Sequence, residues 1–277
     1  MIQRVSPTSS PTSHYENFPV GFLVSAKYRP DIHAVYAFAR VADDFADEPQ
    51  FEGSRLERLD EWGRNLEAAA SGRPPGHPVF VALAETIRRR EVPVQLLRDL
   101  LSAFRQDAVK QRYESWDEVL DYCTRSANPV GRLVLWVTEH RDESLLPFSD
   151  ALCTGLQLAN FWQDLSVDHP RGRSYIPRAD AVEEDVDLEA LVRGEPQSGF
   201  PALFDALVAR TREFFEAARP LPRRLEGMLR YEIAATWHGG RLVLERSAVL
   251  GERALKVRPS LTALDKVLIL LKAMRYP

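Results

Sequence analysis

The two stretches YAFARVADDFAD (residues 36–47) and QLANFWQDLSVD (residues 157–168) carry the strongest structural signal in this chain. In each stretch, polar residues recur at spacings of three or four, which places them on one face of an α-helix. Carboxylates set among core-forming residues are costly to bury unless positive charge accompanies them. Two such helices facing each other would therefore need cations between them. The first face holds Tyr36, Arg40, Asp43 and Asp47, and the second holds Gln157, Asn160, Asp164 and Asp168.

The composition around these stretches is that of a soluble globular protein. The chain has 277 residues, of which 45% are hydrophobic and 27% charged, and its net charge of −4 gives no general attraction to nucleic acid. We expect the two cysteines, Cys123 and Cys153, to be reduced thiols in a cytoplasmic protein. Residues 1–13 are rich in Ser and Pro and are predicted to form a disordered tail, followed by one all-helical domain over residues 14–277.

Apolar residues recur mostly at helical spacing, and Pro and Gly fall between the periodic segments. The fold class is therefore predicted to be all-α. Asp31 and Ser115 are candidate helix caps, and residues 180–199, which are acidic and punctuated by Pro and Gly, are expected to form a surface excursion outside the predicted helices. The predicted helices cover residues 30–47, 52–71, 77–91, 94–110, 116–139, 148–168, 200–218, 222–250 and 260–274.

The paired aspartates indicate a magnesium site. Asp43 and Asp47 lie about 6 Å apart along one helix face, and they offer hard oxygen ligands without His or Cys partners. Mg²⁺ usually keeps several waters and completes its shell with substrate phosphates, so a Mg²⁺–diphosphate cluster is the natural ligand of two opposed pairs. The alternative is two ordinary solvated faces. A di-iron bundle is excluded because no His of this chain has Glu three residues before it.

The segment RGRSYIP (residues 171–177) follows the second aspartate pair directly. Arg173 can recognise phosphate with two hydrogen bonds, and the phenol of Tyr175 can donate one more. Arg40 lies one turn before Asp43 and is either a structural partner of a carboxylate or a clamp on phosphate.

At these residues the chain resembles the squalene/phytoene synthase family, the head-to-head prenyl-diphosphate synthases. The resemblance rests on Tyr36-x-x-x-Arg40-x-x-Asp43-Asp44-x-x-Asp47, on residues 122–131, on the Gln157 to Asp168 pattern and on Arg173-x-Tyr175, and it spans roughly residues 14–275. Leu165 follows Asp164, so the second Asp-Asp-x-x-Asp of the chain-elongating prenyltransferases is absent. Residues 14–20, 126–131 and 160–164 are most similar to the branch of the family that serves bacterial hopanoid biosynthesis.

This resemblance implies a single-domain isoprenoid-synthase helical bundle around a central cavity. It also implies the conversion of presqualene diphosphate to hydroxysqualene, by Mg²⁺-assisted loss of diphosphate, cation rearrangement and capture by water. The implied metal ligands are Asp43, Asp47, Asn160, Asp164 and Asp168, with Arg40 and Tyr175 also catalytic. The implied substrate-binding residues are His14, Phe18, Tyr36, Arg40, Tyr122, Gln157, Asn160, Arg173 and Tyr175.

The implied cation needs a dry cavity lined by apolar and aromatic groups. Candidates for that lining are Phe22, Phe38, Phe161, Trp136 and Trp237, although for each of them packing in the core is the favoured interpretation.

Two other functions remain open at this point. One is a sister reaction that condenses two farnesyl diphosphates to presqualene diphosphate or squalene, or two geranylgeranyl diphosphates to phytoene. The other is a non-catalytic helical scaffold that binds polyprenyl diphosphates. In addition, the apolar run at residues 267–271 lies between Lys266 and Lys272, and is either a packed terminal helix or a face that rests peripherally on the inner membrane.

Overall fold

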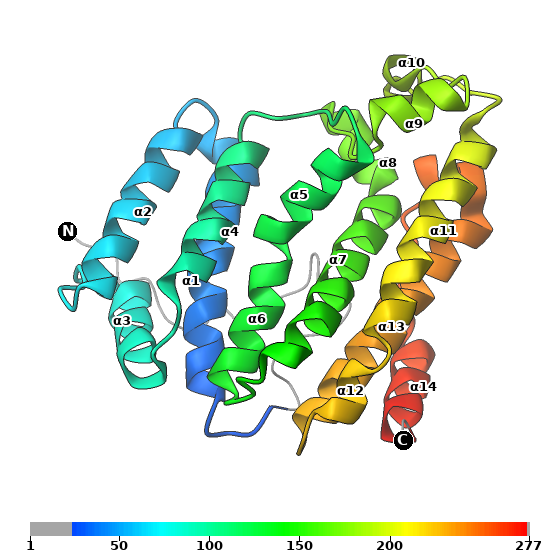
Figure 1. The fold of residues 1–277 in the computed structure, drawn as a ribbon. Coiled ribbons are helices and arrows are strands. Elements are labelled where there is room, and N and C mark those ends of the chain that lie inside the picture. The colour runs from blue at the N-terminus through cyan, green and yellow to red at the C-terminus, as the bar shows by residue number, and fades with distance from the viewer. Residues whose placement is uncertain (1–23, 276–277) are drawn as a thin grey trace.

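The computed structural model describes residues 24–275, and within that range the regular elements are helices (Figure 1). The predicted all-α class is confirmed. His14, Phe18, Phe22 and the predicted tail lie outside the described residues. The α-helices are α1 (Arg29–Asp47), α2 (Arg55–Ala70), α3 (Pro78–Arg90), α4 (Val94–Asp107), α5 (Trp116–Ser126), α6 (Asn128–Val137), α7 (Leu146–Gln163), α8 (Leu165–Asp168), α9 (Arg178–Glu183), α10 (Leu188–Val192), α11 (Phe200–Ala218), α12 (Leu221–Arg224), α13 (Leu229–Leu250) and α14 (Ala263–Met274).

Three of the predicted helices are interrupted, and the prediction of continuous segments is wrong there. The segment 116–139 is two helices, because Pro129 lies in the first turn of α6 and has no N–H to continue α5. The segment 148–168 breaks at Asp164, which ends α7 and begins α8. The segment 222–250 holds the short α12 and then α13.

Two further expectations need correction. The segment 180–199 contains the end of α9 and all of α10, whose first turn is capped by the Asp187 side chain. Asp31 does not cap α1: its carboxylate is buried and accepts hydrogen bonds from Thr86, Arg89 and Arg90. Ser115 does cap α5, as predicted, by accepting from the backbone N–H of Glu118.

Helix α7 is the centre of the bundle. It packs against α5, α6, α11 and α13, and its buried residues include Leu158, Phe161 and Trp162. The helices on either side approach it closely at glycines. A Cβ added at Gly131 of α6 would lie 2.5 Å from the Cys153 sulfur, and one at Gly240 of α13 would lie 2.3 Å from a methyl of Leu156.

The C-terminal ends of α1, α4 and α7 come together at the upper end of the view in Figure 1. Below them the core is closed by large side chains. Phe38, Trp62 and Phe80, for example, are in mutual aromatic contact and almost without exposed surface. This arrangement leaves the polar ends of α1, α4 and α7 around a shared space.

Candidate active site

A cavity of about 410 Å³ lies between α1, α4, α5, α7, α8 and the loop that follows α8. Its walls carry eight carboxylates and four arginines, so the space has a strong excess of negative charge. The lining residues are Arg40, Asp43, Asp44, Asp47, Glu48, Pro49, Glu52, Arg55, Asp107, Gln111, Tyr122, Gln157, Asn160, Phe161, Asp164, Val167, Asp168, Arg171, Arg173 and Tyr175.

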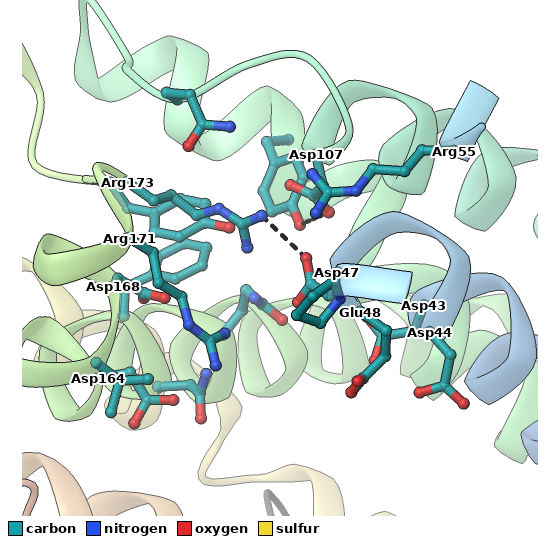
Figure 2. Close-up of a pocket in the computed structure, with 18 of the residues that line it drawn as sticks. Asp43, Asp44, Asp47, Glu48, Arg55, Asp107, Asp164, Asp168, Arg171 and Arg173 are labelled. Atoms are coloured by element: carbon teal, nitrogen blue, oxygen red, sulfur yellow. Dashed lines mark hydrogen bonds and ion pairs between the residues drawn. The ribbon is translucent and has the colours of Figure 1, made fainter. Parts of the chain in front are cut away.

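The last turns of α1 form one wall. Asp43 and Asp47 share a face of this helix, and Figure 2 shows both carboxylates beside the open space. The Arg40 guanidinium lies 2.7 Å from an Asp44 oxygen and 3.5 Å from an Asp43 oxygen. Arg40 therefore neutralises part of this wall, while its side chain keeps enough exposure to reach a ligand.

The opposite wall is the end of α7 together with α8. Gln157, Asn160 and Asp164 follow one another at helical spacing along this wall, and Asp168 comes one turn later. Asp164 is buried and forms a two-pronged ion pair with Arg258, which lies in the segment between α13 and α14. This wall is thus partly neutralised by a residue from a distant part of the sequence.

The loop after α8 bridges the two walls. Gly172 has φ +76°, a left-handed conformation that suits glycine, and lets the chain turn back after α8. The following N–H, of Arg173, donates to the Asp168 carbonyl. The Arg173 side chain then extends across the cavity, where its Nη2 donates to Asp47 over 2.9 Å, as the dashed line in Figure 2 marks.

The inner end of the cavity is aromatic. The rings of Phe161 and Tyr175 stack with centroids 3.7 Å apart, and the Tyr122 ring lies 5.9 Å from that of Tyr175. The Tyr122 hydroxyl donates to Asp107 over 2.6 Å, and the other Asp107 oxygen is buried without a hydrogen-bond partner. This end offers ring faces and one unsatisfied acceptor.

The crowding of acids shows in their proton affinities. Burial, with a further contribution from Asp47, raises the pKa of Asp43 to about 7. Burial is also the main cause that raises the pKa of Asp107 to about 7 and that of Asp168 to about 7. These carboxyl groups hold their protons more tightly than usual because they are buried, and Arg40 and Arg173 offset only part of that effect.

The donor set fits Mg²⁺ that a diphosphate helps to bind. Among residues 24–275, no three His, Cys, Asp or Glu side chains are close enough to enclose a metal ion by themselves. Mg²⁺ does not require such a cage, since waters and phosphate oxygens can complete its shell. Carboxylates on two facing walls, with an unsatisfied Asp107 oxygen and an unsatisfied Arg55 Nε, leave room for both the cation and the anion.

Most of the site residues predicted from the sequence line this one cavity. They are Arg40, Asp43, Asp47, Tyr122, Gln157, Asn160, Asp164, Asp168, Arg173 and Tyr175. Tyr36 lies on α1 one turn before Arg40 and is not among the lining residues. His14 and Phe18 fall outside the described residues.

Of the aromatic candidates, Phe161 lines the cavity and three others do not. Phe38 packs against Trp62 and Phe80, while the ring N–H groups of Trp136 and Trp237 donate to backbone carbonyls, of Arg90 and Phe215 respectively. For these three the contacts agree with packing in the core, the alternative that the sequence favoured.

Sequence reasoning missed several residues of the site. Asp107 had a readable signal, since it lies on the buried stripe of α4 with Leu97, Leu100 and Leu101. Arg258 had none, because it reaches Asp164 only through the folded chain. The other missed lining residues are Glu48, Pro49, Glu52, Arg55, Gln111, Val167 and Arg171.

Comparison with known proteins connects this site to a family. A family model described as squalene/phytoene synthase matches residues 12–265. A hydroxysqualene synthase of Rhodopseudomonas palustris is 39% identical over 79% of this chain and 74% of the relative, and one of Sinorhizobium fredii is 35% identical over 84% and 80%. Among solved structures, squalene synthase HpnC from Alicyclobacillus acidocaldarius superposes with a TM-score of 0.79 at 34% identity, covering 83% of this chain and 87% of that one.

Proposed function

The chain belongs to the squalene/phytoene synthase family, and from this premise we propose that it is an Mg²⁺-dependent hydroxysqualene synthase. Its substrate is then presqualene diphosphate and its product hydroxysqualene. The product is the one in the names of the relatives, the substrate is the one that the family resemblance implies, and the chemistry is the one that the cavity supports.

One observation carries the proposal: two walls of carboxylates and an aromatic inner end meet in a single cavity. A prenyl diphosphate has the same division, with a highly charged head and an apolar body. Asp43 and Asp47 on one side, and Asp164 and Asp168 on the other, would hold Mg²⁺ around the head, with Asn160 as a further ligand. Arg173 and Arg40 would contact the phosphate oxygens.

The reaction begins with departure of the diphosphate, which takes the electron pair of the C–O bond. When bound, Mg²⁺ neutralises the phosphate charge and so makes the diphosphate a better leaving group. Arg173 can follow this charge because it already spans the cavity to Asp47. Gln157 and Asn160, from α7, would orient the head through hydrogen bonds.

The rest of the site then protects the carbocation. The stacked pair Phe161 and Tyr175, with Tyr122, presents ring faces whose electrons stabilise positive charge. The cation rearranges, a water oxygen donates a lone pair to form the new C–O bond, and the resulting oxonium loses a proton. Tight packing around the rings would limit where water can enter.

The test is product identification. Purified protein is incubated with Mg²⁺ and presqualene diphosphate, without NADPH, and the organic extract is analysed by mass spectrometry. We expect hydroxysqualene and released diphosphate. Recovery of unreacted substrate alone would contradict the proposal.

A matched pair of variants separates catalysis from mere binding. Asp164→Ala should abolish turnover while circular dichroism shows the same helix content, and Asp205→Ala, an exposed aspartate on α11, should retain full activity. Unchanged turnover in Asp164→Ala would remove the metal assignment and favour the scaffold alternative. Formation of presqualene diphosphate or squalene from farnesyl diphosphate, or of phytoene from geranylgeranyl diphosphate, would favour the condensing sister reactions.

A further inference from the structure

Helix α14 exposes an apolar stripe that nothing in the described structure covers. Five of its large apolar side chains are between 42% and 68% exposed, although ordinary surfaces carry such residues singly. They lie within eleven consecutive residues: Leu264, Val267, Leu268, Leu271 and Met274. Their spacings of three and four place them on one side of the helix.

The other side of α14 is already used. Ile269 and Ala273 are buried against Ala234 and Ala235 of α13, in a small cluster separate from the main core. The stripe therefore points away from the bundle, and Figure 1 shows α14 at the outer edge of the molecule beside α13. Packing within the chain accounts for one face of this helix and leaves the other without a partner among residues 24–275.

The charges around the stripe are basic, although the whole chain has a net charge of −4. Lys266, Lys272 and Arg275 are exposed on or beside α14, and Lys256 is exposed just before it. The acid of this helix, Asp265, is engaged by Arg246 and caps the helix through Thr262. An apolar stripe with basic neighbours complements the acyl chains and the anionic headgroups of a lipid surface.

The length of the helix decides how it would meet a bilayer. Its 12 residues span about 18 Å, well short of a hydrocarbon core. No helix in the described part of the chain is long and apolar enough to cross a membrane. We propose that α14 lies in the plane of an anionic bilayer surface, with the five apolar side chains inserted and the basic residues at the headgroups.

The segment before α14 ties this face to the cavity. Arg258 pairs with Asp164, and the Gln163 side chain donates to the Pro259 carbonyl over 2.6 Å. The segment that leads into α14 is therefore joined to the α7 wall of the cavity. The docking proposal itself rests on α14 alone and does not depend on the proposed reaction.

Vesicle co-flotation tests the proposal with the full chain. We expect wild-type protein to float with vesicles that contain phosphatidylglycerol, to bind pure phosphatidylcholine vesicles at least about tenfold less, and to be released from the anionic vesicles in part by salt. Leu268→Glu/Leu271→Glu should lower the partition coefficient on anionic vesicles at least about tenfold. Lys272→Gln/Arg275→Gln should lower it by about tenfold or more, since each basic residue contributes about fivefold.

The matched control is Val81→Glu, because Val81 is 52% exposed on α3, on the other side of the molecule from α14 (Figure 1). This variant should float like wild type, and all variants should keep wild-type turnover of detergent-dispersed substrate. Absence of wild-type flotation, or equal flotation of the Leu268→Glu/Leu271→Glu variant, would overturn the proposal. A dimer in light scattering that this variant dissociates, without vesicle binding by wild type, would instead assign the face to a second copy of the chain.

Discussion

Three carboxyl groups of the cavity lower the stability of the folded protein when they ionise. Asp43, Asp107 and Asp168 each have a pKa raised to about 7, so in the folded protein each ionises only near neutral pH. A group whose pKa is higher in the folded than in the unfolded state binds more protons when folded. The free energy of unfolding that it contributes therefore falls as pH rises from about 4 to about 7, and the loss is complete above that range.

This pH dependence of the free energy of unfolding can be tested at Asp43. Asp43→Asn removes the charge, so its thermal midpoint should exceed that of wild type by roughly 1–3 °C above pH 7, a modest effect because the side chain is partly exposed. Turnover should fall by more than about 100-fold, since a ligand for Mg²⁺ is lost. Thermal denaturation and a diphosphate-release assay measure the two effects.

The change of this thermal-midpoint difference with pH serves as an internal control for the Asp43→Asn experiment. The advantage of Asp43→Asn in thermal midpoint should grow between about pH 5 and pH 7 and then level off. An advantage that is constant over this range would show that the pKa of Asp43 is not raised. Taking the difference from wild type cancels His169 and His238, whose pKa values are lowered to about 4 by burial and which act in the opposite direction.

Arg258 supports a second prediction at this scale. Arg258→Gln leaves the buried Asp164 carboxylate without that cation, so we expect a loss of about 1–3 kcal/mol in the absence of metal. Mg²⁺ with inorganic diphosphate should recover much of the loss, because Asp164 then has a new positive partner. Arg98→Gln, which breaks an exposed pair with Glu67, should cost less than about 1 kcal/mol and show no such recovery. Equal losses with and without the ligands would argue against Asp164 as a metal ligand.

The four paired aspartates could be predicted at this scale because helical spacing alone places them on two faces, and they do line one cavity. The Arg258 contact could not, because 94 residues separate it from Asp164. The local spacing of residues predicts which face of a helix a residue lies on, but only the tertiary fold determines which residues contact that face.

At the scale of elements, the packing of the bundle depends on how closely α6 approaches α7. A side chain at Gly131 would meet Cys153 and Ser149 of α7, each at 2.5 Å from the added Cβ. Gly131→Ala should therefore destabilise the protein by about 1–3 kcal/mol, even though alanine favours helix by about 1 kcal/mol over glycine. Chemical denaturation monitored by circular dichroism measures the change.

Gly63 of α2 is the matched control. A Cβ there would meet mainly the flexible end of Arg105, at 2.9 Å, which can shift at low cost. Gly63→Ala should be neutral or stabilising by up to about 1 kcal/mol. If Gly131→Ala also stabilises the protein, the close approach of α6 and α7 is not required.

The helix boundaries show how far the elements could be predicted from the sequence. The helix at residues 200–218 agrees with α11 at both ends, and most others agree within a few residues. The break before α6 was readable from Pro129, but the break at Asp164 has neither Pro nor Gly to mark it. There the chain departs from the helix where Asp164 pairs with Arg258, a tertiary interaction.

For the molecule as a whole, the cavity joins α1, α4, α5, α7 and α8, so a ligand bound there should stabilise all of them together. A ligand at 100 times its dissociation constant adds about 2.7 kcal/mol, which corresponds to roughly 5 °C in the thermal midpoint of a protein this size. We expect this shift only with Mg²⁺ and inorganic diphosphate together, because each neutralises the other within the cavity. A full shift in the thermal midpoint with Mg²⁺ alone, or no shift with both ligands together, would contradict the shared site.

The all-helical class could be predicted from periodicity, and the single cavity from the facing acids. For Phe38, Trp136 and Trp237 the sequence favoured the core without deciding it, because an aromatic residue on an apolar face can fit either a core or a ligand wall. The tertiary contacts decide between a core and a ligand wall, as the packing of Trp62 and Phe80 against Phe38 shows.

The three elevated carboxyl pKa values have one more consequence, for the solvent. Below neutral pH, Asp43, Asp107 and Asp168 are protonated, because burial raises the pKa of each to about 7. Binding of divalent cations and pyrophosphate would release these protons, so the measured enthalpy of binding should vary with the ionisation enthalpy of the buffer. Ligand binding would then release protons to the solvent, and ligand release would take them up again.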